Sequence, residues 1–368
     1  MSFEKINKKL GFGAMRLKMN GDKVDYDEFI KMADTFMENG FNYFDTAHGY
    51  IEGKSEIAIG ECISPRYKRE DFILANKLSE WFVKKEEEVI PFFEKQLETC
   101  RVDYFDFYLC HAVCADNYEK YKSINAFEIQ KKLKEQGKIK HIAISFHDSA
   151  EVLDRILTEQ PQLEAVQLQI NYLDYDDPGV QSEACYNVAV KHGKKVIVME
   201  PVKGGALVNL PSKAAELLDE LNGGSYASYA LRFAASHPEV IVVLSGMGNA
   251  DMMTDNINTF NDFKPVTEEE YKVLKNVSKE IRKAKLIPCT ACNYCADVCP
   301  EKLSISRMFG VYNGVLGAGY NTAQAKEKMP EGKNALDCIK CGKCETVCPQ
   351  NIEIRAKLEE IGKKVFNE

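Results

Sequence analysis

Short apolar runs alternate with longer amphipathic segments along the chain from Leu10 to about Phe260. The runs have the length of buried strands, and the segments between them place apolar residues at the 3.6-residue spacing of a helix. In residues 25–39 this spacing joins Phe29, Met32, Ala33 and Phe36. A chain that repeats strand and helix in this way is expected to fold as an α/β protein with a parallel sheet.

The predicted strands span residues 10–15, 41–45, 72–77, 104–111, 141–145, 165–169, 195–199 and 240–245. The predicted helices between them include residues 25–39, 85–101, 118–136, 149–159, 181–192 and 225–237. Eight strand–helix units in about 250 residues favour a (β/α)8 TIM barrel over a doubly wound sheet. A Rossmann fold would also need G-x-G-x-x-G after its first strand, and the segment from Gly11 to Arg16 lacks the third glycine.

The chain has 368 residues, which is more than one hydrophobic core usually fills, so we expect a large domain and a smaller one. The strand–helix repeat ends near Pro265. Thr267 and the three glutamates after it are typical of the first turn of a helix. We therefore predict a barrel over residues 1–264, a linker helix over 265–286 and a small domain over 287–368.

Eight of the 13 cysteines lie after residue 288, in two runs with the same spacing. The first run is Cys289, Cys292, Cys295 and Cys299, followed by Pro300. The second run is Cys338, Cys341, Cys344 and Cys348, followed by Pro349. Both read C-x2-C-x2-C-x3-C-P, which is the bacterial [4Fe-4S] pattern, and the segment resembles bacterial two-cluster ferredoxins. This resemblance implies that the small domain is α+β and ferredoxin-like.

In two-cluster ferredoxins, three closely spaced thiolates bind one cluster and the fourth binds the other cluster. This arrangement would give one [4Fe-4S] cluster the ligands Cys289, Cys292, Cys295 and Cys348, and the other cluster the ligands Cys338, Cys341, Cys344 and Cys299. Zinc is the alternative, because C-x2-C is also a zinc spacing. Zinc uses two such pairs for each ion, whereas both runs here carry an extra cysteine and a trailing proline, so we predict iron–sulfur clusters.

Acidic residues outnumber basic residues by 56 to 48, which gives a net charge of −8 with both signs interspersed. This balance argues against nucleic-acid binding, which needs a basic patch. No apolar run approaches the roughly 20 residues of a membrane span. Residues 1–15 also lack the apolar core of a signal peptide. We therefore expect a cytoplasmic protein that does not bind membranes.

Catalytic groups of TIM barrels sit at the C-terminal ends of the strands. At these ends the sequence has Asp45, with Tyr50 just beyond it, then Lys77 and then His111. Each alone has a structural explanation, such as an ion pair or a core histidine. An acid, a phenol, an amine and an imidazole at consecutive strand ends together indicate an active site.

These residues fall within segments that resemble the aldo/keto reductase family over about residues 10–256. The segments are Phe44-Asp45-Thr46-Ala47 with Tyr50, Ser55-Glu56, Asn76-Lys77-Leu78, Asp103 to His111, Gly137-Lys138-Ile139 and Ala143-Ile144-Ser145. The resemblance implies that a nicotinamide reduces a small-molecule carbonyl by hydride transfer. It also implies that Tyr50 protonates the oxygen, that Asp45 and Lys77 assist Tyr50, and that His111 orients the carbonyl.

The same resemblance points to residues that bind the nicotinamide cofactor. They are Ser145, Gln167, Asn171, Gly246 and Asn256. Residues 245–256 contain neither lysine nor arginine, the side chains that ordinarily meet a 2′-phosphate, so both NADP(H) and NAD(H) stay open. Pocket walls are expected from His48, Trp81, Phe82 and the segment 300–337, which is either a plain surface loop or a flap at the barrel mouth.

A barrel of this type followed by such a cysteine module resembles the iron–sulfur branch of aldo/keto reductases. Clusters pass single electrons whereas a nicotinamide passes a hydride, and no flavin motif is recognisable in the sequence. Three interpretations follow. The clusters exchange electrons with a redox partner protein or a bound flavin; or they are structural in an ordinary carbonyl reductase; or the barrel is idle and the chain is an electron-transfer or redox-sensing protein.

Overall fold

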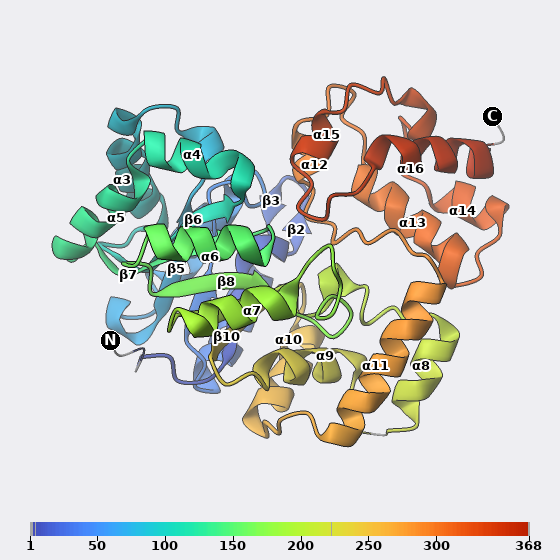
Figure 1. The fold of residues 1–368 in the computed structure, drawn as a ribbon, viewed down its shortest axis with the longest axis horizontal. Coiled ribbons are helices and arrows are strands. Elements are labelled where there is room, and N and C mark those ends of the chain that lie inside the picture. Colours follow the sequence, from blue (N-terminus) through green and yellow to red (C-terminus); the bar gives the residue numbers. More distant parts are fainter. Residues whose placement is uncertain (1–2, 4, 222, 367–368) are drawn as a thin grey trace. The chain divides into compact units, whose positions relative to one another are not determined.

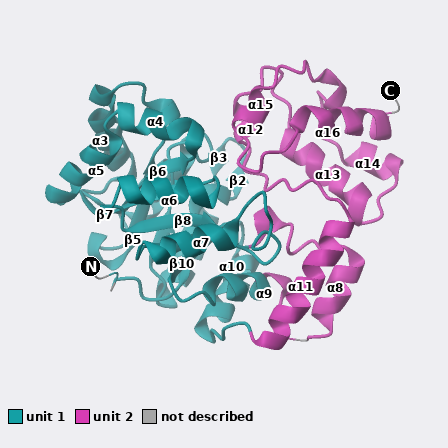
Figure 2. Ribbon diagram, in the orientation of Figure 1, with its two compact units in different colours: residues 1–201, 228–266 teal, residues 202–227, 267–368 magenta. Residues whose placement is uncertain are grey.

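The computed structural model describes residues 3, 5–221 and 223–366, and the chain divides into two compact units (Figures 1 and 2). The first unit consists of Met1–Pro201 and Ser228–Val266, and the second consists of Val202–Ala227 and Thr267–Glu368. Among the described residues, no helix is both long and apolar enough to cross a membrane.

The first unit is built around a closed parallel barrel with the strand order β1-β10-β9-β8-β7-β6-β5-β4. Its strands are β1 (Leu10–Gly13), β4 (Tyr43–Asp45), β5 (Ile73–Leu78), β6 (Phe105–Val113), β7 (Ile139–Phe146), β8 (Ala165–Gln169), β9 (Lys195–Met199) and β10 (Val240–Ser245). Each predicted apolar run overlaps one of these strands, so the predicted (β/α)8 barrel is confirmed. A two-stranded antiparallel hairpin, β2 (Met19–Asn20) and β3 (Lys23–Val24), lies outside the barrel sheet.

Buried side chains from the strands fill the interior of the barrel. They are Tyr43, Ile73, Ala75, Phe107, Leu109, Ala143, Ala165, Ile197, Val242 and Leu244. These buried side chains make the interior a packed core and not a pore. A substrate therefore cannot enter the barrel interior, and the expected active site is at the C-terminal ends of the strands.

Helices of the first unit follow the strands along the chain, and all but the last, α10, lie between successive strands (Figure 1). They are α1 (Tyr26–Glu38), α2 (Lys54–Ala58), α3 (Val89–Cys100), α4 (Ala115–Ser123), α5 (Ala126–Glu135), α6 (Ala150–Glu159), α7 (Ser182–Lys191), α9 (Tyr226–Ala235) and α10 (Ala250–Asn261). The predicted helix over 118–136 is wrong in one respect, because it is two helices. Asn125 between them has φ +54°, a left-handed conformation that asparagine tolerates and that ends a helix.

Short 3-10 and π segments complete this unit. They are η1 (Ala14–Arg16), η2 (Ile59–Ile63), η3 (Arg69–Asp71), η4 (Glu80–Phe82) and η5 (Glu86–Glu88). Two of them follow strands directly: η1 follows β1, and η4 lies one residue beyond β5. Each turns the chain at the C-terminal end of its strand and so presents side chains at the barrel mouth.

The second unit contains two groups of helices. The pair α8 (Ser212–Asp219) and α11 (Glu268–Lys283) pack against each other, and η6 (Lys203–Gly205) precedes α8. As predicted, Thr267 caps α11: its side chain accepts from the Glu270 N–H, and the Glu270 carboxylate accepts in return from the Thr267 N–H. The other elements are α12 (Tyr294–Asp297), α13 (Ile305–Gly317), α14 (Thr322–Lys328), η7 (Ala335–Asp337), α15 (Lys343–Thr346), α16 (Ile354–Ile361) and η8 (Gly362–Phe366).

The segment 300–337 is not a plain surface loop, so that interpretation is wrong. It forms α13 and α14, and Met308, Phe309 and Tyr312 on α13 are buried in the core of the second unit. The cysteines Cys295 and Cys344 belong to the same core. The described residues of this unit form helices and connecting segments, and no strand is assigned among them. The predicted domain boundaries at 264 and 286 stay a prediction.

Candidate active site and cysteine centre

Lys77 and Asp45 form a buried ion pair on neighbouring strands. Lys77 Nζ donates to Asp45 Oδ1 at 2.7 Å and to the carbonyl of Thr46 at 2.9 Å. The two side chains are only 1% and 4% exposed. Burial lowers the pKa of Lys77 and raises the pKa of Asp45, while the attraction between the two charges opposes both shifts. The pair thus fixes a cation inside the end of the barrel.

Tyr50 lies next to this cation. It sits in the turn after β4, where its N–H donates to the Ala47 carbonyl at 3.0 Å, and its side chain is buried. Lys77 Nζ lies 4.7 Å from the centroid of the Tyr50 ring. The Tyr50 ring in turn meets the His111 ring edge-on, with the centroids 5.9 Å apart. The structure therefore brings all four predicted catalytic side chains into one contiguous cluster.

His111 occupies an irregular point of β6. The register of β6 against β7 shifts between Cys110 and Val113, and Ala112 has φ +52°. His111 Nδ1 lies 2.7 Å from Ser79 Oγ, and its carbonyl accepts from the Tyr121 hydroxyl at 2.6 Å. Burial, with smaller contributions from the charges of Lys77 and His147, holds the pKa of His111 well below its usual value. The imidazole is therefore neutral at physiological pH.

Ser79 is a residue of this site that was not predicted from the sequence. The Ser79 hydroxyl is able to donate to His111 Nδ1, and in that arrangement the ring proton is carried by Nε2. The signal was present, because Ser79 follows Lys77 by two residues and alternate residues of a strand share a face. Ser79 is buried although serine is a polar residue.

Trp81 and Phe82 form an apolar wall beside His111. Both belong to η4, and they are 40% and 46% exposed. The Trp81 ring lies 5.0 Å from the His111 ring and 5.9 Å from the Phe82 ring, measured between centroids. These two predicted wall residues therefore lie next to the catalytic cluster.

Gln167 in the middle of β8 and Ser145 near the end of β7 are paired in register on neighbouring strands. Gln167 Oε1 is buried, and no donor to it is found among the described residues. Ser145 Oγ accepts from the Ala112 N–H at 2.7 Å, which leaves the hydroxyl proton to donate elsewhere. The Gln167 oxygen is able to accept from the NH2 of a carboxamide group, and the Ser145 hydroxyl is able to donate to its C=O.

Asn171 is engaged within the chain. Its Oδ1 accepts from the N–H groups of Leu173 and Asp174, and its Nδ2 donates to Asp174 Oδ2 and to the carbonyl of Glu200. The side chain therefore closes a turn after β8. A direct role of Asn171 in cofactor binding stays a prediction.

Gly246 and Asn256 lie at the end of β10 and on α10. Asn256 Nδ2 donates to Ser245 Oγ at 2.9 Å. Arg16 packs on Gly246 so closely that a Cβ there would lie 2.9 Å from Arg16 Cδ. Residues 245–256 contain no cationic side chain, but in the structure Arg16 of η1 lies beside them. This contact depends on the pairing of β1 with β10, so neither segment of the sequence indicates it.

The N-terminus of α10 already has an acidic neighbour. The Ala250 N–H donates to Glu28 Oε1 at 3.1 Å, and Asn249 caps the helix by accepting from the Met252 N–H. A pyrophosphate at this terminus would therefore meet a carboxylate as well as backbone N–H groups. Arg16 is the nearby group that can offset that negative charge.

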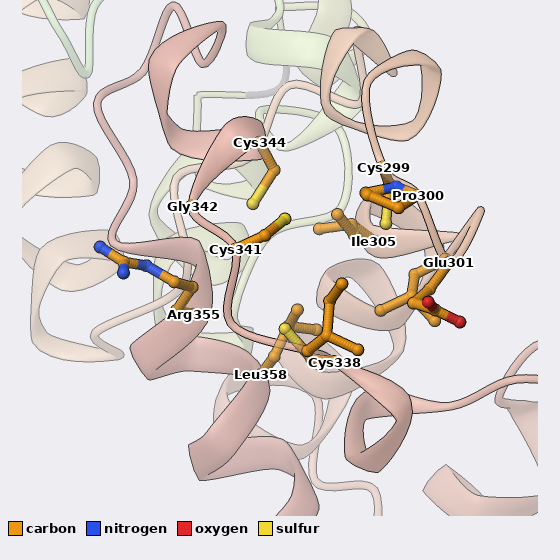
Figure 3. Close-up of a pocket in the computed structure, with 12 residues that line it drawn as sticks. Cys299, Pro300, Glu301, Ile305, Cys338, Cys341, Gly342, Cys344, Arg355 and Leu358 are labelled. Carbon is orange, nitrogen blue, oxygen red and sulfur yellow. The ribbon is translucent and has the colours of Figure 1, made fainter.

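Four cysteines surround one pocket in the second unit (Figure 3). They are Cys299, Cys338, Cys341 and Cys344, the set that the sequence assigned to one cluster. The rest of the lining includes Leu303, Ile305 and Leu358, with Arg355 at the side. Burial and the charges of Glu345, Cys338 and Cys299 raise the pKa of Cys344 to about 11. A bound metal cluster would stabilise the thiolate form of such a thiol at neutral pH.

The other four cysteines also approach one another. Burial raises the pKa of Cys295, and the next contributions come from Cys292, Cys289 and Cys348, with a smaller one from Cys344. Cys348, from the second run, is thus near the first three cysteines of the first run. Within the part of the chain that the structure describes, no three His, Cys, Asp or Glu side chains converge tightly enough to hold a single metal ion. The thiols of the other set, Cys299, Cys338, Cys341 and Cys344, line a pocket instead.

Two family models match the chain. Residues 9–279 match the aldo/keto reductase family, and residues 285–352 match the 4Fe-4S dicluster domain. Among curated proteins, an uncharacterized oxidoreductase, YqkF of Bacillus subtilis (strain 168), is 25% identical over 306 residues, which cover 74% of this chain and 93% of that protein. Dihydrodiol dehydrogenase 3 of Bos taurus is 24% identical over 307 residues, covering 76% and 90%.

Solved structures share the barrel. The holo form of the aldo-keto reductase AKR11C1 from Bacillus halodurans has a TM-score of 0.61 at 25% identity, covering 73% of this chain and 91% of that chain. An aldo/keto reductase from Klebsiella pneumoniae, in complex with NADP and acetate, has a TM-score of 0.60 at 18% identity and the same coverage. With the matched family model covering residues 9–279, the chain is an oxidoreductase that belongs to the aldo/keto reductase family and carries a C-terminal 4Fe-4S dicluster domain.

Proposed function

We propose that this chain reduces the carbonyl group of a small-molecule aldehyde or ketone, with Tyr50 as the proton donor. The observation that carries this proposal is the position of Lys77 Nζ, which is bonded to Asp45 at 2.7 Å and lies 4.7 Å from the Tyr50 ring. A bound reduced nicotinamide would supply the hydride to the carbonyl carbon. The protein's residues supply the proton and the orientation.

Tyr50 gives its phenolic proton to the carbonyl oxygen as negative charge develops there. A free phenol titrates near pH 10, so the phenolate that is left must be stabilised. The ammonium of Lys77 does this at close range, and Asp45 keeps that ammonium in place. His111 is neutral and, with its proton on Nε2, donates a hydrogen bond to the same oxygen.

Gln167 and Ser145 are proposed to hold the nicotinamide carboxamide. The support is the buried Gln167 Oε1 without a described donor and the hydroxyl proton that Ser145 retains. Gly246, Asn256 and Arg16 are proposed to line the path of the dinucleotide, and Arg16 contributes the positive charge that a phosphate group needs. This charge favours NADP(H), while NAD(H) is the second candidate.

We further propose two [4Fe-4S] clusters in the second unit. One would use Cys289, Cys292, Cys295 and Cys348, and the other Cys338, Cys341, Cys344 and Cys299. Four thiols around one pocket, rather than at one point, suit a cluster of several metal atoms and support the second set. When bound, such clusters supply or accept single electrons.

The test combines kinetics with analysis of the purified protein. Tyr50→Phe is expected to abolish NADPH-dependent reduction of a simple aldehyde. The matched control is Tyr43→Phe, because Tyr43 is a buried barrel tyrosine whose hydroxyl makes no bond to a described residue, and it should keep the wild-type rate. Absence of aldehyde reduction in both wild type and Tyr50→Phe would favour an idle barrel in an electron-transfer protein, whereas equal measurable rates would exclude Tyr50 as the proton donor.

Anaerobically purified protein should contain about eight iron and eight sulfide ions per chain if two [4Fe-4S] clusters are present. The same sample is analysed for flavin and for nucleotide. Bound flavin would identify the group that links one-electron and hydride chemistry, whereas zinc without acid-labile sulfide would overturn the cluster assignment.

A further inference from the structure

His48 carries an ion pair at the barrel mouth that the proposed catalytic chemistry does not use. It lies two residues before Tyr50, in the turn after β4. Its Nδ1 is 2.8 Å from Glu56 Oε2 on α2. The His48 side chain is 35% exposed, whereas the Glu56 side chain is only 1% exposed. One side of the imidazole therefore meets solvent while the other is tied to a buried carboxylate.

Glu56 is held from its other side as well. Its Oε1 accepts from Asn76 Nδ2 at 2.9 Å and from Gln96 Nε2 at 2.8 Å. Gln96 Nε2 also donates to Asn76 Oδ1 at 3.2 Å, so these amides cannot turn away without losing bonds to each other. Both oxygens of the buried Glu56 carboxylate thus have hydrogen-bond partners. The amides on Oε1 are fixed by their bonds to each other, so His48 on Oε2 is the partner that is able to move.

The surroundings of the imidazole favour its charged form. The hydrogen bond to Glu56 raises the pKa of His48, the Glu56 charge adds to this, and partial burial opposes it. From η4 and α3, the neighbours are the uncharged rings of Phe82 and Phe92, whose centroids lie 4.9 Å and 5.1 Å from His48. Glu52 in the same turn pairs with Lys54, the first residue of α2, at 2.6 Å.

The imidazole is also connected to the catalytic cluster through ring contacts. Phe82 contacts His48 on one side and Trp81 on the other, and Trp81 contacts His111. A substrate lying on the exposed Trp81–Phe82 wall with its carbonyl at His111 would therefore extend toward His48. The apolar wall suits a hydrophobic body, and His48 suits a group of opposite charge beyond it.

We propose that His48 is a specificity-determining residue that selects carbonyl substrates bearing a carboxylate or another anionic group. This inference rests on the proposed carbonyl reduction by Tyr50. Glu56 acts as a positioning residue that orients and charges the imidazole, and it does not touch the substrate.

The experiment compares two near-isosteric aldehydes, 4-formylbenzoate and its neutral methyl ester. Wild type is expected to show a higher kcat/KM for the anion, and His48→Gln should lower the anion-to-ester ratio about fivefold, the worth of a partly exposed ion pair. Glu56→Gln should lower the same ratio, because it removes the charge that holds the imidazolium. His192→Gln is the matched control: His192 pairs with Asp154 at 2.7 Å on α7 and α6, and its loss should leave the ratio unchanged.

Two further measurements use only the wild-type protein, so they do not depend on whether a variant folds correctly. The anion-to-ester ratio should fall as pH rises through the elevated pKa of His48, since the imidazole then loses its charge. It should also fall with added salt, because screening affects only the charged substrate. A ratio that is independent of both pH and salt, and equal in wild type and His48→Gln, would overturn the inference. If neither aldehyde is reduced, the proposed function itself fails, which is a different result.

Discussion

The Lys77 ammonium and the Asp45 carboxylate meet at 2.7 Å, and both side chains are almost completely shielded from water. Removing one partner leaves an uncompensated buried charge, which costs about 3–5 kcal/mol. Asp45→Asn should therefore lower the free energy of unfolding by that amount, as measured by urea denaturation. Lys77→Met should lower kcat/KM for aldehyde reduction by about 10²–10⁴-fold, because Tyr50 loses its cation. Wild-type kinetics in Lys77→Met would contradict the assigned role.

The cysteine assignment makes a prediction about pairs of variants. Cys341→Ser and Cys299→Ser should alter the same cluster, because both residues line one pocket although they come from different runs. Cys348→Ser should alter the other cluster. Electron paramagnetic resonance of the dithionite-reduced proteins, with iron content, distinguishes these outcomes. Cys114→Ser is the control, since Cys114 precedes α4 and serine is a good N-cap there. Grouping of Cys299 with Cys348 would refute the exchanged ligands.

Gly204 tests how the first cysteine run is supported. It has φ +61°, and a Cβ would lie 2.2 Å from the carbonyl oxygen of Thr290, between Cys289 and Cys292. Gly204→Ala should therefore displace this loop and reduce the iron content. Gly205→Ala separates the two causes, because Gly205 has φ +96° but its Cβ would meet nothing closer than 3.9 Å. In Gly205→Ala the free energy of unfolding should fall by about 1–2 kcal/mol from backbone strain alone, and the iron content should not change. Equal iron loss in both variants would rule out the contact with Thr290.

The position of Arg16 beside Gly246 predicts that its replacement weakens cofactor binding more than it slows the reaction. Arg16→Met should raise KM for the dinucleotide about tenfold, because a charge-assisted bond to a phosphate contributes roughly 1.5–3 kcal/mol. The rate at saturating cofactor should change much less. Lys18→Met is the control, since Lys18 is an exposed lysine paired with Asp25 at 3.2 Å. A loss confined to NADPH would assign Arg16 to the 2′-phosphate, whereas an equal loss with NADH would assign it to the pyrophosphate.

The lowered pKa of His147 predicts that the free energy of unfolding falls as the pH is lowered. Burial lowers the pKa of His147 from 6.5 to about 4. As pH falls below 6.5 the unfolded chain takes up this proton before the folded chain does, so stability present above pH 6.5 is lost on the way to pH 4. His147→Gln should remove about 2 kcal/mol of the stability difference between pH 7 and pH 5. Urea denaturation at both pH values measures it, and identical differences in wild type and variant would contradict the prediction.

The barrel and the four central side chains could be predicted because each depends on local signals. Apolar runs mark the strands, and the ends of those strands carry Asp45, Lys77 and His111. Residues that meet only after closure could not be found in this way. Arg16 reaches Gly246 because β1 pairs with β10, and no local pattern in either segment indicates that contact.

Other differences have local physical causes. The helix expected over 118–136 breaks at Asn125, where a left-handed residue interrupts an otherwise continuous amphipathic pattern. The glycines of the segment 300–337 suggested a loop, but the apolar face of α13 buries Met308 and Tyr312 and so favours a helix. Burial of an apolar face outweighs the low helix propensity of glycine there.

The pairing of β1 with β10 has a consequence for assembly. In a chain made from its N-terminus, Leu10 and Gly11 are synthesised long before their partners Val243 and Leu244, so the ring can close only after β10 has been made. Arg16 and Gly246 lie at one end of the seam between β1 and β10. A ligand that contacts both sides of this seam would stabilise the closed ring, because binding to the folded state alone raises its stability. Amide exchange at Phe12 and Ser245 would report this closure directly.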